Sequence, residues 1–171
     1  MLHLLALHGN GGGASRYQLC QPYFQGHGVE FVAHTMPGFE GRALLNPVLS
    51  WQELLEDLRE KLASLPRPRW LLGHGIGASV VLQFLQDHAD WVEGAVIHSP
   101  VGARLGQRRF PRLMRPPWVR GLIKACLSQP WLMPLWSALL FRRPVPQQAR
   151  RKFFSEYARC QAFGGFFDLL S

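Results

Sequence analysis

Four short apolar segments alternate with helical segments through the first hundred residues, and this alternation constrains the fold more than any other feature. The segments are Leu2–Leu7, Val29–His34, Arg69–Gly73 and Gly94–His98. Apolar runs of this length, bounded by glycine or proline, are typical of strands buried on both faces of a sheet. Strands separated by single helices need right-handed crossovers, so the pattern predicts an α/β fold with a parallel sheet of about four strands.

Helices are predicted between these strands and throughout the last third of the chain. Ser15–Gln25 is expected to be helical, Ser50 caps Trp51–Ala63 with Glu53 as its capping-box partner, and Ala78–His88 follows the third strand. Beyond Pro100 the sequence predicts no strand and three further amphipathic helices: Trp118–Leu127, Trp131–Phe141 and Gln147–Cys160. We therefore expect residues 1–100 to form an α/β core and residues 101–171 a helical region of the same structural domain.

Charge is unevenly placed along the chain, whose net charge is +8. Residues 1–100 hold 6 Lys/Arg and 9 Asp/Glu, whereas residues 101–171 hold 13 Lys/Arg and 2 Asp/Glu. A basic segment with tryptophans suits nucleic acid, anionic lipid or an acidic substrate. No repeated spacing of basic and aromatic residues gives a specific nucleic-acid signal. A membrane surface stays open as a partner, with Trp118, Trp131 and Trp136 toward lipid and Arg108, Arg109, Arg112 and Arg115 toward headgroups.

The three cysteines, Cys20, Cys126 and Cys160, lie far apart and fit no metal-binding spacing. The short apolar start has no basic lead and no cleavage site, so no secretory signal is visible. These features predict reduced thiols in a cytoplasmic protein with no metal and no cofactor.

A sharp turn rich in glycine follows the third strand and leads directly into a helix: Gly73-His74-Gly75-Ile76-Gly77. Strand, tight turn and immediate helix form the context of the nucleophile elbow, whose pattern is G-x-S-x-G. The flanking glycines let the strand and helix backbones approach each other closely. In this chain the serine position of the pattern holds Gly75.

Three further motifs occur in the expected order. His8-Gly9-Asn10-Gly11-Gly12 follows the first strand, Pro37-Gly38-Phe39-Glu40-Gly41 follows the second, and a helical segment rich in proline and tryptophan follows the fourth. With these motifs the chain resembles the α/β-hydrolase superfamily, in particular its cap-containing esterases, lipases and haloperoxidases. The resemblance implies a partial α/β-hydrolase fold in which residues 101–171 form the cap.

The resemblance also assigns roles to single positions. Gly75 takes the place of the nucleophile, and the backbone N–H groups of Asn10 and Ile76 would form the oxyanion hole. Substrate-pocket positions would fall on His8, Gly9, His74 and Ser99, and the ligand would be a small apolar or acyl-type molecule. The family's acid and histidine come after the cap, where the chain stops at Ser171. We therefore expect a catalytically impaired or truncated hydrolase-like domain, from a natural truncation, a disrupted reading frame or an incomplete segment.

Other functions stay open at this stage. The chain is either a basic module that binds anionic membrane or a partner chain through the exposed edge Gly94–His98, or an ester hydrolase completed by a missing segment and a serine at position 75. A dinucleotide-binding turn, G-x-G-x-x-A, matches at Gly73 and at Gly9, but neither following strand ends in the acidic residue that would hold a ribose. Ser79 and the cysteines are expected to be structural rather than substitute nucleophiles.

Overall fold

The computed structural model describes residues 1–101, 112–141 and 143–169. It contains a parallel sheet of β1 (Leu2–Leu7), β2 (Val29–His34), β3 (Arg69–His74) and β4 (Gly94–His98), in the order β2-β1-β3-β4. The predicted α/β fold with a sheet of four strands is confirmed. Strand β3 runs one residue further than predicted, to His74.

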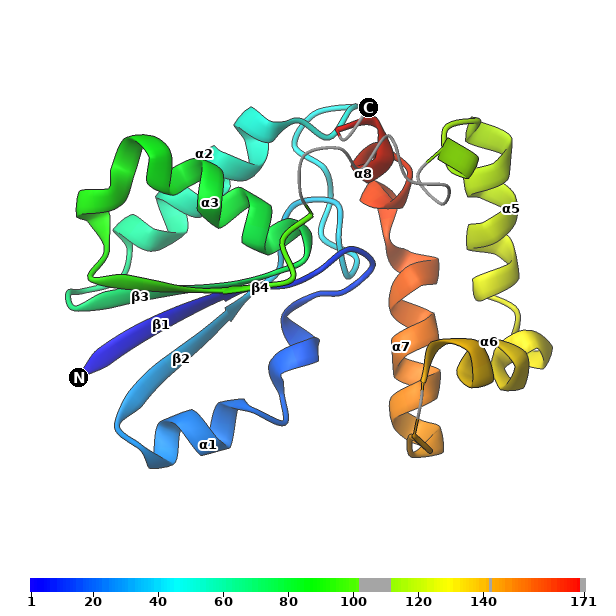
Figure 1. Cartoon of the computed structure of the whole chain (residues 1–171), viewed down its shortest axis with the longest axis horizontal. Helices are drawn as coiled ribbons and strands as arrows, with labels where there is room; N and C mark the ends of the chain where they lie inside the picture. Colours follow the sequence, from blue (N-terminus) through cyan, green and yellow to red (C-terminus); the bar gives the residue numbers. More distant parts are fainter. Residues whose placement is uncertain (102–111, 142, 170–171) are drawn as a thin grey trace.

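Helices cover both faces of this sheet (Figure 1). Helices α2 (Trp51–Ala63) and α3 (Ile76–His88) lie on one face, and α1 (Gln21–Gly26) lies on the other. Successive side chains of a strand point to opposite faces, so Leu5 and Leu7 enter the main core while Leu4 and Ala6 pack in a smaller cluster with Phe31. This is why β1 is apolar without alternation.

Helix α2 begins with only half of the predicted capping box. The Ser50 hydroxyl accepts a hydrogen bond from the Glu53 N–H at 3.1 Å, as expected for an N-cap. The Glu53 carboxylate, however, accepts from the N–H of Leu45 at 2.6 Å. The reciprocal bond to Ser50 was therefore a wrong prediction, because the preceding loop folds back and donates to this carboxylate instead.

Two predicted helices are each divided in the structure. The predicted helix Ser15–Gln25 consists of a 3₁₀ turn, η1 (Ala14–Tyr17), and the separate helix α1. The predicted helix Trp131–Phe141 consists of η4 (Pro130–Leu132) and α6 (Met133–Leu140). Both predictions placed a proline inside a helix. A proline has no N–H to donate to the carbonyl four residues earlier and its ring clashes there, so Pro22 and Pro134 stand in the first turn of a new helix.

The remaining helices are η2 (Ala89–Trp91), α5 (Pro117–Leu127), α7 (Gln147–Arg159), η5 (Gln161–Phe163) and α8 (Gly165–Asp168). We call residues 112–141 and 143–169 the helical region; in it, α7 lies between the sheet and α5 (Figure 1). Buried Met114, Phe154 and Phe163 belong to the same apolar cluster as Leu5 and Leu7 of β1. The two parts of the chain thus share one core. No helix in the described ranges is long and apolar enough to cross a bilayer.

Candidate functional site

The turn between β3 and α3 has the expected strand–turn–helix form, with Gly75 at its bend. Gly75 has φ 57° and ψ −118°, in the region that L-residues rarely adopt. Its N–H donates to the carbonyl of His98 at 3.1 Å, and its own carbonyl accepts from the N–H of Ser79 at 3.2 Å. The bend is thereby tied to the end of β4 and to the first turn of α3.

Steric contacts explain the two flanking glycines. A Cβ atom on Gly73 would lie 2.5 Å from the Cα of Ala78, and one on Gly77 would lie 2.5 Å from the carbonyl oxygen of Leu7. Both obstacles are backbone atoms, so any side chain would force the strand and the helix apart. A Cβ on Gly75 would meet the Cα of Gly9 at 3.2 Å. A side chain at position 75 would therefore require a small shift of the Gly9 backbone, in addition to the cost of the positive φ.

The loop after β1 lies against this bend. The N–H of Gly77 donates to the carbonyl of His8 at 3.2 Å, which holds the loop to the start of α3. The backbone nitrogen of Asn10 lies 3.9 Å from the place that a Cβ on Gly75 would occupy. Within the described residues, the N–H groups of Asn10 and Ile76 have no hydrogen-bond partner. The Asn10 Oδ1 atom is buried and also lacks one there.

His8 is buried inside this loop. It is 1% exposed, its Nδ1 lies 2.8 Å from the carbonyl oxygen of Gly9, and its Nε2 accepts from the N–H of Met36 at 3.1 Å. These partners require the neutral tautomer with its proton on Nδ1. Burial lowers the pKa of His8 to about 4, although the bond to Gly9 and the Glu40 carboxylate oppose the shift. Both ring nitrogens of His8 are therefore engaged within the loop, which the side chain holds in place.

The other predicted pocket positions lie at the ends of β3 and β4. The rings of His74 and His98 are 5.0 Å apart between centroids, and both residues are exposed. Partial burial, then the neighbouring His98 and Arg16, lower the pKa of His74. Ser99 is exposed and has a positive φ of 49°. Gly9 faces His74, since a Cβ on Gly9 would lie 3.1 Å from its Nδ1 atom.

Two of the side chains considered as substitute nucleophiles, Ser79 and Cys160, are engaged or shielded. The Ser79 hydroxyl donates to the carbonyl of Val101 and accepts from its N–H, both at 3.0 Å. Cys160 is fully buried, and burial raises its pKa to about 11. A thiol with a raised pKa is a poor nucleophile because the thiolate is the reactive form. Cys20 and Cys126 are free, the first exposed and the second half-buried.

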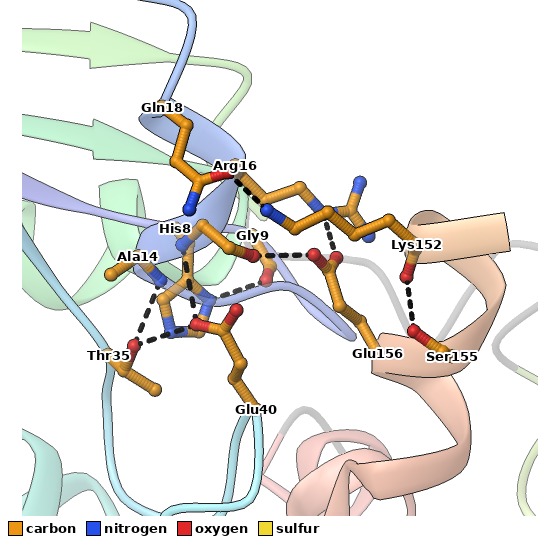
Figure 2. Close-up of polar contacts among 11 residues, drawn as sticks. His8, Gly9, Ala14, Arg16, Gln18, Thr35, Glu40, Lys152, Ser155 and Glu156 are labelled. Carbon is orange, nitrogen blue, oxygen red and sulfur yellow. Dashed lines mark hydrogen bonds and ion pairs between the residues drawn. The ribbon is translucent and has the colours of Figure 1, made fainter. Parts of the chain in front are cut away.

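A polar network that the sequence did not predict joins the helical region to the loop after β1 (Figure 2). Glu156 of α7 is 1% exposed; its carboxylate accepts from the Ser15 hydroxyl at 2.5 Å and pairs with Arg16. Lys152, one turn earlier on α7, donates to the side chain of Gln18. The sequence held one clue to this network: Glu156 is one of two acidic residues beyond position 100.

Helix α7 also covers the glycine loop directly. A Cβ on Gly11 would fall 2.2 Å from the ring of Tyr157, so the ring packs directly against the backbone of the loop. Burial raises the pKa of Tyr157. Together with the Glu156 network, this contact places α7 over the loop that contains Asn10.

A second ionic cluster holds the loop after β2. The Asp57 carboxylate lies 2.6 Å from His34 Nε2 and 2.5 Å from Arg42 Nη2. Burial by itself would raise the pKa of Asp57, but the bonds from His34 and Arg42 outweigh it and hold the pKa below its usual value. Arg42 also donates to the carbonyl of Thr35, and the Thr35 hydroxyl donates to the Glu40 carboxylate at 3.1 Å. The Glu40 carboxylate in turn accepts from the N–H of Ser15.

A cavity of about 550 Å³ lies between η1 on one side and, on the other, the segment from the end of α6 to α7. Its lining combines apolar side chains with the polar network just described: Ser15, Arg16, Gln18, Leu19, Phe141, Val145, Pro146, Gln148, Ala149, Lys152, Phe153 and Glu156. The Arg16 guanidinium carbon lies 4.1 Å from the centre of the Phe153 ring, and its Nη2 atom is buried without a partner among the described residues. Residues His8, Gly9, His74 and Ser99, predicted to line a pocket, do not line this cavity. In the described part of the chain, no group of three His, Cys, Asp or Glu residues could hold a metal ion.

Comparison with known proteins decides the family. The sequence profile described as "Alpha/beta hydrolase family" matches residues 4–170. The chain belongs to the α/β-hydrolase family. No curated protein matches the chain.

Solved structures agree in fold with this family assignment. An epoxide hydrolase, CorEH without ligand, superposes with a TM-score of 0.77 at 16% identity, over 99% of this chain and 65% of its own. An esterase from Exiguobacterium antarcticum gives 0.72 at 13% identity, over 99% of this chain and 66% of its own. Polyneuridine aldehyde esterase gives 0.53 at 22% identity, over 60% of this chain and 42% of its own. The chain thus spans between 42% and 66% of the length of these three structures.

Proposed function

We propose that this α/β-hydrolase domain binds a small apolar, acyl-type molecule and does not hydrolyse it. One observation carries the proposal: the residue at the bend between β3 and α3 is Gly75, which has no side chain that could attack a carbonyl. Removing the serine of a catalytic triad costs about a millionfold in turnover. The N–H groups of Asn10 and Ile76, which have no partner among the described residues, support an oxyanion hole beside Gly75.

The acidic and histidine partners of a triad are also lacking in the last third of this sequence. The 171 residues contain no histidine after His98. The acidic residues beyond position 100 are Glu156, which is paired with Arg16, and Asp168, which is paired with Arg120. A serine placed at position 75 would therefore meet no Asp–His pair from the helical region.

The cavity beside α7 supports binding. Its volume suits a small molecule, and its apolar wall of Leu19, Val145 and Phe153 suits a hydrocarbon chain. Arg16 Nη2 is a buried donor without a partner in the described residues, and Lys152 lies at the same cavity. A carboxylate or carbonyl oxygen on the ligand would satisfy this donor, because buried polar groups in proteins are almost always hydrogen-bonded. An apolar molecule with an acidic or ester head therefore fits the cavity.

Turnover of p-nitrophenyl butyrate tests the catalytic half of the proposal. We expect no hydrolysis above the buffer rate, and no large gain for Gly75→Ser, since the helical region supplies no Asp–His pair to activate that serine. Turnover by the unaltered chain that disappears on changing one side chain, for example Ser79→Ala, would contradict the proposal.

Calorimetric titration with decanoate tests the binding half. We expect Ala149→Phe to abolish binding because Ala149 lines the cavity and a phenyl ring would fill part of it. The matched control is Ala63→Phe at the exposed end of α2, which should bind like the unaltered chain. Equal binding by both variants, or none by the unaltered chain, would refute the cavity as the ligand site.

The edge of the sheet favours a second candidate function, assembly through β4. Strand β4 is last in the strand order, and Val96 is 44% exposed on it. An unpaired strand edge is a template for pairing with another chain. Light scattering tests this: we expect a dimer that Val96→Lys converts to a monomer, and a monomeric unaltered chain would remove the candidate.

The cellular location completes the proposal. Cys20, Cys126 and Cys160 are all free thiols. Free cysteines persist in reducing compartments, which supports a cytoplasmic location. Expression with a fluorescent tag and fractionation would test it.

A further inference from the structure

Half of the large hydrophobic side chains that are exposed in the described residues fall in the short stretch 113–140. Six of them lie on or beside α5 and α6, and we call them the Trp–Leu surface: Trp118, Leu122, Trp131, Leu135, Leu139 and Leu140. Their exposed fractions run from 51% for Leu140 to 74% for Trp131. Concentrated apolar exposure of this kind marks an interaction surface, whereas single exposed leucines are ordinary.

The spacing of these residues makes two stripes. On α5, Trp118 and Leu122 are four residues apart, which puts them on one face of the helix. Another face of α5 buries Val119 and Leu127 in the core. Along η4 and α6, Trp131, Leu135 and Leu139 repeat at the same interval.

The two helices are held together and stand away from the sheet. The Trp136 indole N–H of α6 donates to the carbonyl of Cys126 at the end of α5, at 3.1 Å. Figure 1 shows α7 between the sheet and these two helices. The Trp–Leu surface is therefore on the part of the helical region remote from β4, and assembly through the sheet edge would leave it open.

Charge decides which partner fits this surface. Arg115 lies two residues before α5 and Arg143 three residues after α6, and both are exposed. The acidic groups of the helical region are Glu156, which is buried, and Asp168, which pairs with Arg120. A second copy of this chain would bring a net charge of +8 against the same positive surface. An anionic partner is favoured over self-association.

The apolar side chains select lipid among anionic partners. Nucleic acid offers phosphates and stackable bases but nothing that buries a row of leucines. The surface of an anionic bilayer offers both an acyl boundary for Trp and Leu and headgroups for Arg. Leu140 is followed directly by Phe141, which lines the cavity next to α7, so the chain passes from the Trp–Leu surface to the proposed ligand site at the end of α6.

We propose that the Trp–Leu surface docks this protein onto anionic membranes, with α5 and α6 lying in the plane of the interface. Trp118 and Trp131 enter the boundary between headgroups and acyl chains, while Arg115 and Arg143 contact the anionic headgroups. The proposal goes beyond ligand binding in the cavity and does not depend on it, since docking uses side chains that do not line the cavity.

Sedimentation with sucrose-loaded vesicles tests docking. We expect binding to phosphatidylcholine vesicles that contain one quarter phosphatidylglycerol and little binding to pure phosphatidylcholine. Trp118→Ala combined with Trp131→Ala should lower the partition coefficient by at least roughly tenfold, because two large apolar side chains no longer leave water. Arg115→Gln combined with Arg143→Gln should lower it on the order of thirtyfold on the anionic vesicles.

The matched control removes exposed apolar side chains elsewhere. Leu45 and Val48 are each 66% exposed in the loop before α2, and their combined replacement by alanine should leave vesicle binding unchanged. Equal loss in this control would overturn the proposal, as would vesicle binding that survives the loss of both tryptophans. Binding to heparin but not to vesicles would assign the basic charge to a soluble polyanion and would also overturn it.

Fluorescence supplies a readout that surface charge alone would not move. Vesicles of brominated phosphatidylcholine with phosphatidylglycerol should quench part of the emission of the six tryptophans. Replacing Trp118 and Trp131 by phenylalanine should remove most of this quenching, because the other four tryptophans, Trp51, Trp70, Trp91 and Trp136, are half-buried against the apolar clusters. Quenching that persists undiminished in this variant would show that another face meets the bilayer.

Discussion

The buried, neutral His8 gives the stability of this domain a defined pH dependence. The pKa of His8 is lowered from 6.5 to about 4 by burial. Between these values the unfolded chain takes up a proton that the folded chain excludes, so folding stability rises with pH in this window. Protonation would place a hydrogen on Nε2, the atom that accepts the bond from Met36.

The size of the effect follows from the two pKa values. From pH 7.5 to pH 5, His8 alone should lower the free energy of unfolding by about 2 kcal/mol, and by about 3 kcal/mol at pH 4. Below its folded pKa the native state also binds the proton and the contribution stops growing. The loss is therefore confined to roughly pH 6.5 to 4.

Urea unfolding followed by circular dichroism at pH 7.5, 6, 5 and 4 measures this dependence. The variant His8→Asn removes the titrating group and should show a shallower slope across the window, whatever its stability at pH 7.5. The exposed His27 provides the matched control, because His27→Asn should keep the slope of the unaltered chain. Equal slopes for His8→Asn and the unaltered chain would refute the assignment of the acid sensitivity to His8.

Three further substitutions test contacts of the site by urea unfolding, and a fourth, Gly121→Ala, serves as a control. Gly77→Ala should lower the free energy of unfolding by about 2 kcal/mol or more, since its Cβ would fall 2.5 Å from the Leu7 oxygen. Gly121→Ala in α5 meets no atom within 4 Å and should stabilise the fold by about 0.5 to 1 kcal/mol. Equal effects of the two substitutions would contradict the close approach at Gly77. Asp57→Asn should destabilise the fold at pH 7, because the folded pKa of Asp57 lies below its unfolded value. The difference in free energy of unfolding from the unaltered chain should shrink as the pH falls through that folded pKa. A difference that does not depend on pH would refute the ionic cluster. Glu156→Gln should lower the free energy of unfolding by about 1 to 3 kcal/mol, because it weakens the bonds to Ser15 and Arg16. It should also increase amide hydrogen exchange in α7. Unchanged exchange would show that α7 is held by its apolar contacts alone.

Local signals in the sequence were sufficient for the sheet and the bend. The strands of the sheet are short, mostly apolar segments, with single polar residues such as His3 and Glu30, and their alternation with helices favours a parallel sheet. The bend at Gly75 was predictable because Gly73 and Gly77 fit the close approach of strand and helix. The divided helices show where such signals mislead. Apolar periodicity continues across Pro22 and Pro134, although each proline stands in the first turn of a new helix.

The sequence alone determined the fold class, the order of the strands along the chain and the glycine at the nucleophile position, because these depend on neighbouring residues. Tertiary structure alone decided that Glu156 reaches Ser15 and Arg16, that Tyr157 covers Gly11, and that the cavity lies beside α7. These contacts join residues about 140 positions apart, such as Ser15 and Glu156 at a separation of 141. No local pattern encodes such pairs, since they form only when the shared apolar core brings the helical region against the loop after β1.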